Sequence, residues 1–139
     1  MMCPEWLKMN IQNCINDLLI RGTEDIIQAA EVASVAITVG GAKSQDEIRD
    51  LSLELIRNVV QQGLMEIGDA VGIGHHPTYV YERVDFRVWD LSFEAAMARV
   101  EREWKALGRP NLGDICWLRN TEKGNELSEQ LLKQRGSSS

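Results

Sequence analysis

The stretch LSLELIRNVVQQGLMEIGDA, residues 51–70, decides how this chain folds. In its first half, apolar residues recur three and four positions apart, which predicts an amphipathic helix. Gly63 ends that helix, because glycine adopts a positive φ at no steric cost. Leu64 and Ile67 then predict a short strand over residues 64–68. The stretch is therefore expected to run from a helix through a tight turn into a strand.

The start of this helix is marked by Ser44. Ser44 and Glu47 stand three residues apart, which is the spacing of a capping box. The apolar stripe that follows consists of Ile48, Leu51, Leu55, Ile56 and Val59. We therefore expect a helix that begins after Ser44 and continues to the turn at Gly63.

Four further helices are expected from the same kind of pattern. The first covers residues 4–19, and the second begins after an N-cap at Thr23, although its β-branched second half leaves its end open. Ser92 caps a helix that extends to Leu107, and Thr121 caps the last one. Alternation predicts a half-exposed strand over residues 83–89, and the apolar run at 115–118 predicts another. The fold class is thus mainly α with a small antiparallel sheet (α+β) and about five helices.

A second stretch, ICWLRNTEKGNELSEQLL (residues 115–132), completes a pattern with residues 51–70. Together the two stretches resemble winged-helix proteins, in which the helix-turn leads into one wing strand and the second wing strand leads into a closing helix. The matching positions are Gly63, Leu64, Ile67, Trp117, Leu118, Thr121 and Gly124. The resemblance covers residues 10–72 and 114–134, and it implies one winged-helix-like domain over residues 1–135 with a disordered tail at 136–139. An insertion of about forty residues, containing a complete helix, separates the two wing strands.

The charge pattern argues against the DNA binding that a winged helix implies. The chain has a formal net charge of −6 and a pI of about 4.9. Residues 44–72 hold six acidic and two basic side chains, whereas residues 109–139 hold four and five. The negative charge is concentrated on the helix that would enter the major groove of DNA, where phosphates would repel it. Nucleic acid is therefore not an expected partner.

Chemistry-bearing motifs are sparse. The three cysteines, Cys3, Cys14 and Cys116, are widely spaced and lie in or beside apolar patterns, which favours inert thiols over a disulfide framework. The His75-His76 pair has no neighbouring ligand at metal-binding spacing. The glycine-rich GLMEIGDAVGIG contains no phosphate-binding fingerprint. We expect no enzyme activity, no cofactor and no metal.

The remaining hypothesis is a binding protein. Acidic cytosolic proteins of this size are similar in composition to bacterial immunity proteins, which neutralise basic toxins by direct contact. The expected contact residues are Asp46, Glu47, Asp50 and Glu54, with Trp89 as an aromatic anchor. A plain solvated face is the alternative for the acidic residues, and core packing is the alternative for Trp89.

Two other functions stay open at this point. The winged-helix resemblance implies a transcriptional regulator whose phosphate contacts would be Arg119, Lys123, Lys133 and Arg135. A small enzyme ranks last. No signal peptide or bilayer-spanning run is apparent, so a cytoplasmic protein without membrane contact is expected.

Overall fold

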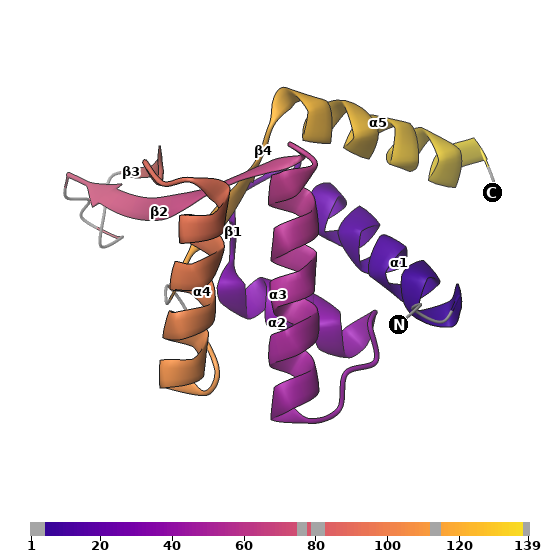
Figure 1. Cartoon of the computed structure of the whole chain (residues 1–139). Helices are drawn as coiled ribbons and strands as arrows, with labels where there is room; N and C mark the ends of the chain where they lie inside the picture. The colour runs from indigo at the N-terminus through magenta and orange to yellow at the C-terminus, as the bar shows by residue number, and fades with distance from the viewer. Residues whose placement is uncertain (1–4, 75–77, 79–82, 112–114, 138–139) are drawn as a thin grey trace.

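The computed structural model describes residues 5–74, 78, 83–111 and 115–137 (Figure 1). In these residues the chain forms five helices and a four-stranded antiparallel sheet, which confirms the predicted α+β class. The elements are α1 (Glu5–Arg21), β1 (Ile27–Gln28), α2 (Ala29–Thr38), α3 (Gln45–Gln61), β2 (Met65–Ile73), β3 (Arg83–Val88), α4 (Phe93–Leu107), β4 (Trp117–Asn120) and α5 (Glu122–Ser137).

The sheet has the strand order β1-β4-β2-β3, with antiparallel neighbours throughout. Strand β4 therefore lies between β1 and β2, although it comes last in the chain. Leu118 of β4 pairs with Ile27 on one side and with Ile67 on the other, and all three side chains are buried. This row joins the sheet to the hydrophobic core, in which helices α1, α2 and α3 contribute most of the remaining side chains.

The turn after α3 is held by the beginning of α5. Gly63 adopts φ 72°, and the Thr121 hydroxyl donates to its carbonyl oxygen at 2.6 Å. The same hydroxyl accepts a hydrogen bond from the amide of Gly124 at 3.1 Å and so caps α5. A Cβ added at Gly124 would lie 2.1 Å from the carbonyl oxygen of Leu64, so only glycine allows this close approach. The two stretches that define the sequence pattern thus meet at one junction.

The caps predicted for the two surface helices are confirmed. Ser44 accepts a hydrogen bond from the amide of Glu47 at 3.1 Å, and Ser92 accepts one from the amide of Ala95 at 3.2 Å. Helices α3 and α4 begin directly after these serines, as the spacing indicated. Each cap satisfies a donor that the first turn of the helix would leave without a partner.

The prediction that Thr23 caps the second helix is wrong. Helix α2 begins only at Ala29, because Ile27 and Gln28 pair with β4 as strand β1 and extend the backbone there. The Thr23 hydroxyl donates instead to the carbonyl oxygen of Leu19 and forms a hydrogen bond with the hydroxyl of Ser128 on α5. Thr23 therefore joins the end of α1 to α5.

Three other boundaries differ from the expected ones. Strand β2 continues to Ile73, because β3 pairs with its distal half. Strand β4 begins at Trp117 and not at Ile115, whose φ of 72° is incompatible with an extended backbone. Helix α5 reaches Ser137, so residues 136 and 137 are helical and not part of a disordered tail.

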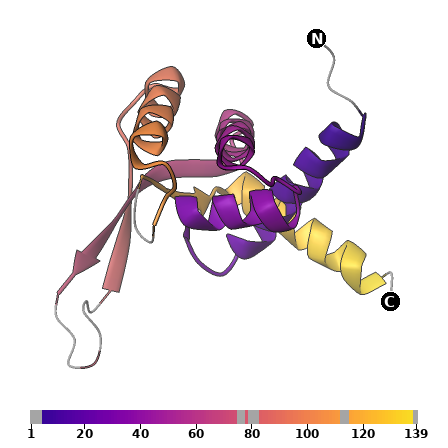
Figure 2. The same cartoon turned by 90° about the horizontal axis from the view of Figure 1, so that it is seen from below.

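The inserted helix α4 lies beside α3, on the same side of the sheet (Figure 1). Its apolar stripe of Met97, Val100 and Trp104 is buried in the common core. Strands β2 and β3, in contrast, extend beyond the helices (Figures 1 and 2). In the part of the chain that the structure covers, no helix is both long and apolar enough to cross a membrane.

Candidate partner-binding surface

The acidic residues of α3 occupy the side of the helix that faces away from the core. Leu55, Ile56 and Val59 are fully buried, whereas Glu54, on the other side of the helix, is exposed. At 3.6 residues per turn, positions 47, 50 and 54 fall on one face, with position 46 at its margin. We call Asp46, Glu47, Asp50 and Glu54 the acidic face, and all four residues are exposed.

One arginine partly neutralises the acidic face. Arg49 Nη1 lies 3.3 Å from Asp46 Oδ1, and Arg49 Nε lies 3.0 Å from Asp50 Oδ1. The side chains of Asp46 and Asp50 nevertheless remain 83% and 68% exposed, so water screens both ion pairs strongly. Arg57 is the second arginine of α3, so this helix carries four carboxylates against two arginines, a net charge of −2.

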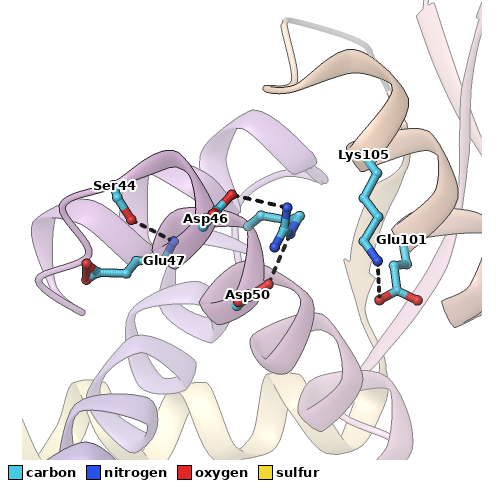
Figure 3. A network of polar contacts seen from close by, with 7 residues as sticks. Ser44, Asp46, Glu47, Asp50, Glu101 and Lys105 are labelled. Carbon is cyan, nitrogen blue, oxygen red and sulfur yellow. Dashed lines mark hydrogen bonds and ion pairs between the residues drawn. The ribbon is translucent and has the colours of Figure 1, made fainter.

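Helix α4 adds two carboxylates next to this face. Glu94 and Glu101 line a groove of about 170 Å³ between α3 and α4, together with Leu53, Arg57, Met97 and Ala98. Glu101 pairs with Lys105 at 3.3 Å, and Figure 3 shows this pair on α4, opposite the side of α3 that carries Asp46 and Asp50. Glu47 lies at the opposite margin of the acidic face from Asp46, and its side chain points away from α4 (Figure 3).

Sequence reasoning did not associate α4 with the acidic face. Glu94 and Glu101 are seven residues apart, so their common helix face was readable from the spacing. Their position beside α3 was not readable, because it depends on packing between helices far apart in sequence. Arg57 of α3 contributes to this packing, with its guanidinium carbon 5.5 Å from the centroid of the Phe93 ring.

Trp89 is not available as a protruding anchor. Its side chain is only 8% exposed, and the guanidinium of Arg99 stacks 3.8 Å from the ring centroid. The structure therefore favours core packing, the alternative considered for this residue. The ring lines the wall of a shallow apolar groove of about 460 Å³ at the C-terminal end of α3. The other residues of this apolar groove are Val60, Gln61, Gly63, Met65, Glu66, Ile67, Val88, Leu91, Phe93, Ala96 and Thr121.

Two of the basic residues considered for phosphate contacts already bind other parts of the chain. Arg119 lies 3.5 Å from Glu66 and 4.6 Å from the centroid of the Phe86 ring. Lys123 Nζ donates to the carbonyl oxygen of Gln62 at 3.0 Å, next to the turn that follows α3. These contacts connect β4 and α5 to neighbouring elements of the fold.

The two thiols in the described residues are held in their protonated form. Burial, with a smaller contribution from nearby Asp17, raises the pKa of Cys14 to about 11. Burial, with smaller contributions from Glu103 and Asp69, raises the pKa of Cys116 to about 12. A nucleophilic cysteine needs the opposite shift. Among the residues that the structure describes, no three His, Cys, Asp or Glu side chains gather into a metal site, and His75 and His76 lie outside that set.

Comparisons with protein-family models, curated proteins and solved structures found no match to this chain.

Proposed function

We propose that this protein is a non-catalytic binding domain that holds a basic partner protein on its acidic face. The observation that supports this most directly is the exposure of four carboxylates on α3, which exceed its two arginines, Arg49 and Arg57. Glu94 of the adjacent helix adds a further carboxylate beside α3, whereas the charge of Glu101 is offset by its ion pair with Lys105. Such a surface accelerates association with a positively charged partner and disfavours acidic ones.

The apolar groove supplies the second part of the interface. The acidic face covers the first half of α3, whereas the groove begins at Val60 and Gly63 at the end of the helix. Leu91 and Val88 at the groove are 46% and 50% exposed. A partner that bears basic residues next to an apolar side chain would contact both areas, and protein interfaces combine an apolar centre with a charged rim in this way.

A bacterial immunity protein is the specific form of this proposal. Such a protein acts by occupying a toxin, so it needs a stable surface and no catalytic groups. The two buried thiols with raised pKa values agree with that role. The neutralised toxin would carry a basic surface that matches the acidic face.

The alternative is a winged-helix regulator that binds DNA, and one observation favours it. Strand β1 lies between α1 and α2 and pairs with β4, which pairs with β2. This is the connectivity expected of a winged helix in which β3 and α4 are inserted between the wing strands. In a helix-turn-helix protein the second helix of the motif, here α3, enters the major groove. We disfavour this function because α4 packs against one side of α3 and the outer side is acidic.

The first partner to test is the product of a toxin-like open reading frame directly upstream, where one exists. In a double variant, Glu47→Lys and Glu54→Lys reverse two charges of the acidic face. We expect its association rate with the neighbouring gene product, measured by biolayer interferometry, to fall by about tenfold or more at low salt. The physical reason is that two attractive charges become repulsive.

A matched control carries Glu126→Lys and Glu129→Lys, two exposed residues of α5 with the same change in net charge. We expect it to bind at close to the normal rate. The acidic face would be ruled out as the binding surface if both double variants lost association rate equally. It would also be ruled out if the Glu47→Lys and Glu54→Lys variant associated at an unchanged rate. A sub-micromolar, salt-sensitive complex with duplex DNA in a mobility-shift assay, or a divergent promoter upstream, would support the regulator instead.

A further inference from the structure

Strand β3 forms one edge of the sheet, and its pairing with β2 shows which of its backbone groups face the open side. The amide of Trp89 donates to the carbonyl oxygen of Ile67 at 3.0 Å, while Val88 stands opposite Gly68. In an antiparallel ladder, this makes Gly68 and Val88 a pair without mutual hydrogen bonds. The N–H and C=O groups of Val88 therefore point away from β2.

Every second residue of β3 shares this orientation, so Val84 and Phe86 also present their backbone groups at the open edge. Their side chains lie on one face of the sheet, where Val84 and Val88 are 54% and 50% exposed. The cross-strand neighbours on β2 are too small to cover them: Gly72, Ala70 and Gly68. The edge thus combines apolar side chains with backbone groups that have no hydrogen-bond partner among the described residues, and it extends beyond the helices (Figure 2).

The charges of β3 match those of a second copy when the pairing is centred on Phe86, near the middle of the strand. If two β3 strands pair antiparallel around a two-fold axis at Phe86, then Val84 faces Val88 of the other copy. In the same arrangement Asp85 faces Arg87 twice, once on each side of the axis. An axis at Asp85 would oppose two aspartates, and an axis at Arg87 would oppose two arginines. Like charges directly opposite destabilise a ladder, whereas opposite charges stabilise it.

We propose that two copies of this chain pair through β3 and form one continuous sheet, with four strands from each copy. With the axis at Phe86, the hydrogen-bonded pairs of the new ladder are formed by Val84, Phe86 and Val88, whose backbone groups point outward, so the new ladder satisfies these groups. Arg83, which has no charged residue opposite it, keeps its own partner Asp85 at 3.3 Å. This interface uses none of the residues of the acidic face, but it shares Val88 with the apolar groove of the proposed function.

The dimer is expected to be weak. A strand of six residues buries less area than a standard protein interface. An association in the micromolar range follows, with monomer at low concentration and dimer at high concentration. Charged edge residues normally discourage pairing with foreign strands, and here the same charges select a second copy.

Sedimentation velocity over a concentration series tests the proposal. We expect the unaltered chain to shift from monomer to dimer, while Asp85→Arg and Arg87→Asp each remain monomeric because each opposes like charges. Mixing the two variants should restore a dimer. The Asp85→Arg copy carries an arginine at both positions 85 and 87, and the Arg87→Asp copy carries an aspartate at both, so opposite charges face each other across the interface. A variant that is merely misfolded would not be rescued by mixing.

Disulfide cross-linking between introduced cysteines tests the register of the two β3 strands. The chain used for it also carries Cys3→Ser, so that Cys3 cannot take part in the cross-link. Across an antiparallel hydrogen-bonded pair the Cα atoms lie about 5.5 Å apart, within reach of a disulfide. Phe86→Cys should therefore cross-link on mild oxidation, whereas Val84→Cys should not, because the two residues 84 are about 13 Å apart along the ladder. A monomer at every concentration, no rescue on mixing, or equal cross-linking at both positions would overturn the proposal. A chain that stays monomeric at every concentration would indicate that the β3 edge pairs, if at all, with a strand of another protein.

Discussion

The helical body and the inserted segment use their apolar residues differently. The body, made of α1, α2, α3, α5, β1 and β4, buries Leu18, Leu55 and Leu118 completely. The segment of β3 and α4 buries one helix stripe and leaves much of its other apolar surface open. Among the described residues six large apolar side chains are exposed, and four of them lie in the segment: Val84, Val88, Leu91 and Leu107. The body therefore provides most of the buried core and carries the acidic face, whereas the segment provides most of the exposed apolar surface that a partner can cover.

The largest difference in the free energy of unfolding is expected between two leucine-to-alanine substitutions, one in the body and one in the segment. Leu55 on α3 is fully buried, whereas Leu107 at the end of α4 is 51% exposed. We expect Leu55→Ala to lower the free energy of unfolding by about 3 kcal/mol, because it removes buried methyl groups and leaves a cavity. Leu107→Ala should change it by less than about 0.5 kcal/mol. Urea denaturation measures both, and a similar loss at Leu107 would contradict the division between body and segment.

The next largest loss of stability is expected from a substitution at Gly124 in the body. Alanine normally stabilises a helix relative to glycine, but a Cβ at position 124 would lie 2.1 Å from the carbonyl oxygen of Leu64. We therefore expect Gly124→Ala to destabilise the chain by about 1–3 kcal/mol. Gln130→Ala, at an exposed position of the same helix, serves as the control and should be nearly neutral. If Gly124→Ala raised the midpoint of thermal unfolding, the close approach of α5 to the turn after α3 would be ruled out.

The smallest loss of stability is expected from removing either of the two serine caps. Ser44→Ala and Ser92→Ala each remove one capping hydrogen bond, which is worth about 1 kcal/mol. Because the buried stripe of α4 belongs to the common core, both changes should shift global unfolding equally. Hydrogen exchange provides the second readout. If Ser92→Ala loosened only the amides of α4 and left the global midpoint unchanged, the segment would be a separate unit.

Much of the fold could be predicted, because its signals are local. The caps at Ser44 and Ser92, the turn at Gly63 and the cap at Thr121 each depend on residues within three or four positions. Strand β1 was missed because two residues carry no periodicity, and only their pairing with β4 makes them a strand. The position of Ile115 before β4 was missed for a similar reason, since sequence does not reveal a positive φ at a β-branched residue.

The candidate surface was predicted in part. The spacing of Asp46, Glu47, Asp50 and Glu54 was sufficient to expect a shared exposed region on α3. The same reasoning could not decide whether Trp89 protrudes or packs, because its burial depends on the neighbouring strand and on Arg99 of α4.

The sequence by itself determined which residues form each long helix and which side of α3 is charged, because helical periodicity places these residues within a few positions of one another. Only the tertiary structure decided that α4 lies beside α3, that Trp89 is buried and that β3 is left at the edge of the sheet. These outcomes depend on contacts between residues distant in sequence, where the same apolar stripe can pack against more than one neighbour. The stretch 51–70 therefore specified a helix, a turn and a strand. Which elements lie next to that helix and that strand was decided by pairing with residues 117–120 and by the packing of α4.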